Sequence, residues 1–200
     1  MEAIRGREQL LVRPGQGFPL LLITYPRGKQ WVAQLLETAY AHTLPALPPE
    51  LTTPYAERFR TLPALVVVLL RPRNPCGCLG HFHPPGTESR LTRRLSGDLG
   101  HPVAEIDLAY EGIRAWDPMP ISSLAASHMG GALAELRFEA AILAVLLHEL
   151  HHLAAPEEPE REIRPLSNNF YAGVVQEFVK RESGREYGMT DAQHESPSGD

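Results

Sequence analysis

Short apolar runs and stretches with helical spacing divide the N-terminal part of the chain. Residues 18–24 form an almost continuous apolar run, which predicts a buried strand. Residues 30–41 place apolar side chains at helical intervals and predict a helix with one core-facing side. Residues 64–70 are apolar at every position and include three consecutive β-branched valines, as in a central strand covered on both faces.

Two shorter extended segments are predicted in the middle of the chain, at residues 79–83 and 103–109. The second alternates in polarity: Glu105 and Asp107 share one side, and Ile106 lies on the other. This alternation predicts a half-exposed strand that pairs with a neighbour.

A long helix is predicted after residue 131. The segment 133–155 contains no proline or glycine and is rich in strong helix formers. Its leucines recur at intervals of three, four and seven residues and form an apolar stripe: Leu136, Leu143, Leu147 and Leu150. Gly130-Gly131 mark the expected entry of the helix, and Pro156 its expected end.

The remaining segments are predicted as connectors, a second helix and a tail. Residues 44–53 are proline-rich, residues 84–100 are polar with glycine, and residues 156–165 are charged, so each is predicted to be a loop. Residues 168–182 have one apolar side and predict a helix. Residues 184–200 carry little apolar content and are expected to be a disordered tail.

The fold class that follows is α+β, in a single domain over residues 1–183. A small mixed sheet is expected to pack on the long helix and on the C-terminal helix that follows it.

Composition narrows the classes of function. The formal net charge is -5, with no basic stripe, so nucleic acid is not an expected partner. No apolar run is long enough to span a bilayer and the first residues do not resemble a signal peptide, so a soluble cytoplasmic protein is expected. Cys76 and Cys78 are too close in sequence for an ordinary structural disulfide. Composition does not indicate an oligomeric state.

The predicted long helix ends in the pattern His-Glu-x-x-His. His148 and His152 are four residues apart, which on a helix places both imidazoles on one face, where they can bind a single metal ion. Glu149 lies one position further round and can reach a water molecule on that metal without binding the metal itself. This combination is typical of a zinc hydrolase.

The chain resembles minimal zincin metallopeptidases, of the SprT-like, ImmA/IrrE-like and phage putative metallopeptidase kind. The resemblance rests on the two extended segments at residues 79–83 and 103–109 followed by Leu-Leu-His-Glu-Leu-His-His at residues 146–152. It implies Zn²⁺ bound by His148 and His152, with Glu149 as the general base for peptide-bond hydrolysis. It also implies that one of the two extended segments is an edge strand that pairs with an extended peptide or protein substrate.

The chain lacks the sequence patterns that supply the third zinc ligand in some of these families. No His-Gly pattern and no metzincin extension follow His152. The remaining zincin type takes a glutamate from a following helix, and Glu177 fits that description best, with Glu160 and Glu162 as loop alternatives. Tyr171 is a candidate to stabilise the oxyanion, and His151 is expected to face solvent.

A second cluster brings two thiols and two imidazoles into eight residues: Cys76, Cys78, His81 and His83. It can be read as a second metal site, as a cleft wall that contacts substrate, or as a loop without chemistry. The alternative to a peptidase is a non-catalytic metal-binding protein-interaction module in which the zinc is structural.

Overall fold

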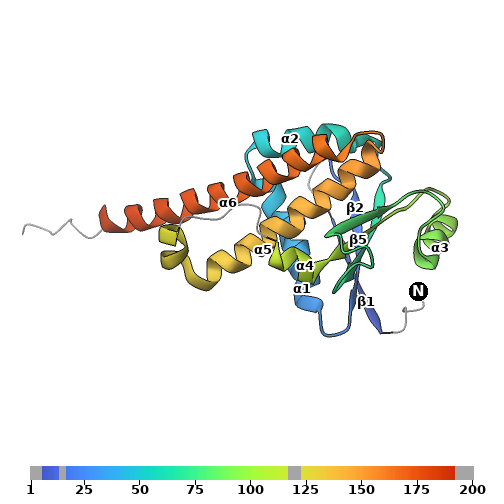
Figure 1. The fold of residues 1–200 in the computed structure, drawn as a ribbon, viewed down its shortest axis with the longest axis horizontal. Coiled ribbons are helices and arrows are strands. Elements are labelled where there is room, and N and C mark those ends of the chain that lie inside the picture. Colours follow the sequence, from blue (N-terminus) through green and yellow to red (C-terminus); the bar gives the residue numbers. More distant parts are fainter. Residues whose placement is uncertain (1–5, 14–16, 117–122, 192–200) are drawn as a thin grey trace, which may run out of the picture.

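The computed structural model describes residues 6–13, 17–116 and 123–191 (Figure 1). These residues form a mixed α and β fold with one five-stranded mixed sheet and six α-helices. The predicted fold class is therefore confirmed at the level of α+β.

The sheet has the strand order β1-β2-β3-β5-β4. Its strands are β1 (Arg7–Val12), β2 (Leu20–Pro26), β3 (Leu65–Arg71), β4 (Gly80–His83) and β5 (Ala104–Ala109). The three central strands β2, β3 and β5 are parallel, and the two edge strands β1 and β4 are antiparallel to their neighbours. β4 is thus the short edge strand on the β5 side of the sheet.

The predicted strands at residues 18–24, 64–70, 79–83 and 103–109 correspond to β2, β3, β4 and β5. The exposure predicted for the last of them is wrong, because every residue of β5 is buried. Its polar side is covered by α3 (Arg90–Leu99), a helix that lies within the stretch predicted to be a loop. Strand β1 was not predicted.

The remaining α-helices are α1 (Gln30–Thr38), α2 (Pro49–Arg58), α4 (Tyr110–Ala115), α5 (Ser123–Ala154) and α6 (Glu160–Asp191). A π-helical turn at Ala39–Thr43 and 3-10 turns at Leu44–Ala46 and Phe59–Thr61 join the first of them. The main core lies between the sheet and α5, where Ile106 and Leu108 of β5 pack with Leu146 and Leu147. In Figure 1, α5 and α6 run side by side, whereas α3 lies on the other side of the sheet.

The ends of the two long helices differ from the prediction. α5 begins at Ser123 and passes through Gly130-Gly131, and it ends at Ala154, as the following Pro156 predicted. α6 begins at Glu160 and contains Pro165, so much of the predicted charged loop is helical. Pro165 has no N–H to donate to the main-chain hydrogen bonds of α6, and the helix continues beyond it to Asp191.

The predicted tail also differs. α6 continues past Ser183 to Asp191, and residues 192–200 lie outside the described residues. None of the helices in the described segments is long and apolar enough to cross a membrane.

Candidate metal centre

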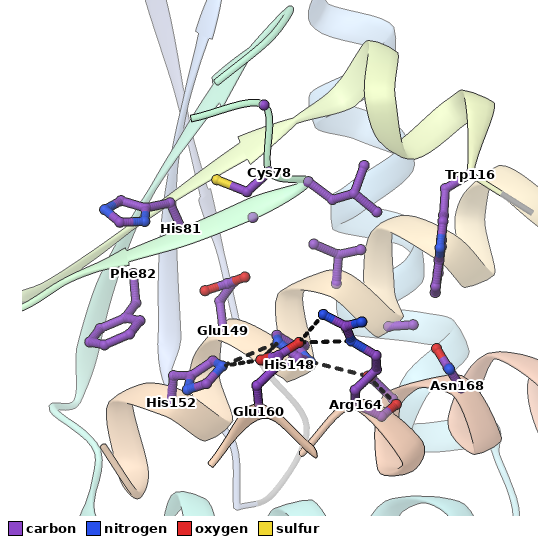
Figure 2. A pocket seen from close by; sticks show the side chains of 16 residues that line it. Cys78, His81, Phe82, Trp116, His148, Glu149, His152, Glu160, Arg164 and Asn168 are labelled. Atoms are coloured by element: carbon purple, nitrogen blue, oxygen red, sulfur yellow. Dashed lines mark hydrogen bonds and ion pairs between the residues drawn. The ribbon is translucent and has the colours of Figure 1, made fainter. Parts of the chain in front are cut away.

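The His-Glu-x-x-His pattern lies in the last two turns of α5, beside the first turn of α6. Its four-residue spacing places the imidazoles of His148 and His152 one above the other, with ring centroids 4.8 Å apart. Both rings border a cavity of about 580 Å³ that β4, α5 and α6 enclose. Figure 2 shows the cavity with Glu149 between β4 and the two histidines.

Glu160, the first residue of α6, completes a group of three ligand atoms. Its Oε2 lies 3.2 Å from Nε2 of His148 and 3.0 Å from Nε2 of His152, and the two Nε2 atoms are 3.2 Å apart. Ligands about 2.0–2.1 Å from a tetrahedral zinc ion lie about 3.4 Å from one another, so these separations are within a few tenths of an ångström of such a site. The three side chains therefore form a triangle of the size that a zinc ion requires.

The two oxygens of Glu160 have different partners. Arg164, one turn further along α6, places its Nε and one terminal nitrogen 2.9 Å from Oε1. Oε2 is left facing the histidines (Figure 2). Burial raises the pKa of Glu160, but His148, Arg164 and His152 outweigh it and hold the pKa below its ordinary value. Glu160 is therefore a carboxylate, as a metal ligand must be.

A hydroxyl group fixes the protonation of His148. The Ser167 hydroxyl donates its only proton to the Arg164 carbonyl, 3.0 Å away, so it accepts from Nδ1 of His148 at 3.1 Å. The proton of the neutral imidazole is thus assigned to Nδ1, and Nε2 presents its lone pair to the other two ligand atoms. Burial lowers the pKa of His148, which also favours the neutral ring.

The orientation of His152 is fixed by strand β4. The ring of Phe82 stacks on the His152 ring with a centroid distance of 5.4 Å and an angle of 12° between the planes. Because Nε2 of His148 carries a lone pair, the two Nε2 atoms and Oε2 of Glu160 converge with at most one proton among the three. A bound cation would satisfy all three.

Glu149 lies deep in the same cavity, with 6% of its surface exposed. Burial raises the pKa of its carboxyl group to about 8; a hydrogen bond from the Phe82 backbone acts in the opposite direction, and the charge of Glu160 adds to the rise. Glu149 is not one of the three grouped ligand residues. It is therefore available for proton transfer.

Glu177, predicted as the third ligand, is not brought to the histidines. It lies about 25 Å further along α6 than Glu160, at a rise of about 1.5 Å per residue, and its Oε1 is 2.6 Å from Nζ of Lys180. The prediction placed a loop at residues 156–165. Because α6 already begins at Glu160, the first turn of this helix approaches the histidines, and its middle does not.

The environments of His151 and Tyr171 also differ from the expectation. His151 is fully buried, and its Nε2 lies 2.5 Å from Oε2 of Glu158 and 2.9 Å from the Arg58 guanidinium. Arg58 is also paired with Glu158, so this network ties α2 to the turn before Glu160. The Tyr171 hydroxyl accepts a hydrogen bond from Arg137, and Tyr171 does not line the cavity.

The Cys/His cluster, for which a second metal site was one of three readings, is divided in the structure. Cys76 and Cys78 form a disulfide, contrary to the expectation from their spacing. Gly77 between them has φ of 74°, which allows the tight turn, and their Cα atoms are 5.3 Å apart. Ligand atoms of the two cysteines and His81 lie within 4.8 Å of one another, but disulfide sulfurs are not thiolate ligands. His83 instead meets Glu105 and Asp107.

The long helix and its two histidines were evident from the sequence, whereas Glu160, Ser167 and Phe82 required the fold. Glu160 was named only as an alternative, and no local pattern indicated the other two. Comparisons of the chain with protein-family models, with curated proteins and with solved structures found no match.

Proposed function

We propose that the chain is a zinc-dependent, zincin-like peptidase in which His148, His152 and Glu160 hold the zinc ion and Glu149 is the general base. The observation that carries this proposal is the triangle of three ligand atoms 3.0–3.2 Å apart, in the same cavity as Glu149. A zinc ion bound there supplies a Lewis acid that acidifies a water molecule and polarises a carbonyl group.

The role of Glu149 follows from its burial. A carboxyl group whose pKa is raised to about 8 binds a proton more readily than an exposed glutamate does. The positive charge of a bound zinc ion favours the ionised form, so in the loaded protein Glu149 is a carboxylate able to accept a proton. In this role it takes a proton from the attacking water and returns it to the leaving amine.

Strand β4 supports a peptide as the substrate. Among the described strands it pairs with β5 alone, and Gly80 and Phe82 border the cavity. An extended peptide that adds to the outer edge of β4 would lie beside Glu149 and the ligand triangle. The resemblance implied that either residues 79–83 or residues 103–109 form the edge strand that binds the peptide. The strand order favours residues 79–83, because β4 lies at the edge of the sheet and β5 does not.

The alternative is a non-catalytic protein-interaction module with a structural zinc ion. Structural zinc sites are closed by four protein ligands, whereas catalytic sites keep one position for water or substrate. The group around His148 contains three ligand residues among the described residues, and it borders a cavity. This arrangement favours an enzyme.

The test compares the zinc-loaded wild type with Glu149→Gln on a mixture of peptides from a proteome digest, analysed by mass spectrometry. We expect both proteins to bind zinc at this site, and only the wild type to generate new peptide ends. A loss of about 10²–10⁴-fold in rate is typical when a general base is removed. Equal cleavage by the two proteins, or none by either, would count against the peptidase and leave the interaction module.

A further inference from the structure

A second group of ligating side chains lies on the face of the sheet opposite α5. In the antiparallel pairing of β4 with β5, His81 is opposite Asp107 and His83 is opposite Glu105. The alternate residue Phe82 stacks on His152, so these four side chains project from the other face. Figure 2 shows His81 and Phe82 leaving β4 on opposite sides.

His83 makes no hydrogen bond to the two carboxyl groups beside it. Its Nε2 lies 3.4 Å from Oδ2 of Asp107 and 3.6 Å from Oε1 of Glu105, and this nitrogen has no hydrogen-bond partner among the described residues. A protonated imidazole between two carboxylates would approach one of them to about 2.8 Å. The observed separations instead match the spacing of about 3.4 Å between two ligands of a tetrahedral zinc ion.

Asp107 carries a buried oxygen that the described part of the chain leaves unpartnered. Its side chain is 6% exposed, and Oδ1 has no hydrogen-bond partner. Arg71 places Nε 2.8 Å from the other oxygen, but as an ion pair without a directed hydrogen bond, because that nitrogen also lacks a hydrogen-bond partner. Burying a carboxylate oxygen without a partner is costly, and a cation removes the cost.

Glu105 is held in place by the start of helix α3. The backbone N–H of Ser89 lies 3.1 Å from both carboxylate oxygens, and the hydroxyls of Ser89 and Thr92 donate to Oε2. These donors orient the carboxylate, as the outer hydrogen bonds of metal-ligating carboxylates do, while Oε1 faces His83. Together with Asp107, Glu105 therefore places two carboxyl groups beside the imidazole of His83, and Arg71 is the cation paired with Asp107.

We propose that His83, Glu105 and Asp107 form a second binding site for a divalent cation of the zinc type. One imidazole and two carboxylates are ligands that zinc accepts, and their ligand atoms all lie within 4.8 Å of one another. His81, exposed on the same face with its ring centroid 5.0 Å from that of His83, is available as a fourth ligand. The site does not depend on the proposed peptidase, because it shares no ligand with the group around His148.

Elemental analysis of zinc per chain tests the proposal with four forms of the full chain. These are the wild type, His148→Ala/His152→Ala, His83→Ala/Asp107→Asn, and the fourfold variant. Each is incubated with zinc sulfate, passed through a desalting column and checked for folding by circular dichroism. We expect two zinc ions in the wild type, one in each double variant and none in the fourfold variant.

His83→Ala alone is the second test, because it leaves the more deeply buried Asp107 and its ion pair with Arg71 unchanged. This substitution is made in the His148→Ala/His152→Ala background. Added zinc should raise the melting temperature of the His148→Ala/His152→Ala protein, and it should not do so once His83→Ala is also present. His101→Ala, which removes an exposed histidine outside both groups, is the matched control and should change nothing. A folded His148→Ala/His152→Ala protein that binds no zinc, or unchanged zinc binding after His83→Ala, would overturn the proposal.

Discussion

Gly80 on strand β4 lies directly against the carboxyl group of Glu149 on helix α5. A Cβ atom added at position 80 would overlap both the Oε1 atom and the side-chain carbons of Glu149. The φ angle at Gly80 is not in the left-handed region, so the requirement for glycine arises from this contact and not from the backbone. Gly80 thereby sets how closely the edge strand approaches Glu149.

Gly80→Ala should therefore displace Glu149 or push β4 away from α5. We expect a loss of about 1–3 kcal/mol in the free energy of unfolding, as is typical of overpacking, measured by urea denaturation. Gly97→Ala is the control, since a Cβ there meets nothing within 4 Å and lies in helix α3. Alanine should be neutral or slightly stabilising at that position, and an equal loss in both variants would contradict the role given to the contact.

Glu160→Gln and Glu177→Gln distinguish the zinc ligand proposed from the structure from the one implied by the resemblance. Glu160→Gln should weaken zinc binding at the site formed by His148, His152 and Glu160 (the α5 site) by more than about 100-fold. This loss exceeds the effect of removing a hydrogen-bond partner of a metal ligand. Glu177→Gln should leave it unchanged, because Glu177 is paired with Lys180. Competition with a chromophoric chelator, in the His83→Ala background so that only the α5 site is titrated, gives the affinities. The reverse order would restore Glu177 as the ligand.

Ser167→Ala removes the hydroxyl that accepts a hydrogen bond from Nδ1 of His148. The ring then loses the partner that keeps its lone pair on Nε2, and we expect zinc affinity at the α5 site to fall by about 10-fold. Asn169→Ala, an exposed position on the same helix, is the control. The same chelator competition measures both variants, and identical affinities would show that Ser167 does not orient His148.

Arg58→Ala breaks the network that joins α2 to the turn before Glu160. It leaves fully buried His151 and its partner Glu158 without a cation, and we expect a loss of about 1–3 kcal/mol in the free energy of unfolding. Zinc affinity at the α5 site should fall as well, because the turn positions Glu160. Arg60→Ala, at an exposed site nearby, should do neither. Destabilisation with unchanged zinc affinity would limit the network to a structural role.

Much of the secondary structure followed from local patterns. The apolar runs at β2 and β3 and the uninterrupted helical spacing of α5 report burial directly, and Pro156 marked the end of α5. Helix α3 was missed because Arg90–Leu99 is mostly polar and contains a glycine. Its buried side depends on the sheet, where Leu91 and Leu95 pack against a cluster that includes Val67 and Leu69 of β3. The alternation of polarity in β5 suggested solvent, but its polar residues face other buried polar groups.

The sequence by itself determined that His148 and His152 share one face of a helix with Glu149 beside them, because a four-residue spacing is a property of the helix alone. The tertiary structure decided which groups meet that face. Glu160, and not Glu177, lies beside the two histidines because α6 begins at Glu160. His83 lies near Glu105 and Asp107, and not with the cysteines, because of the pairing of β4 with β5. Such encounters depend on strand register and helix starts that local sequence only weakly determines.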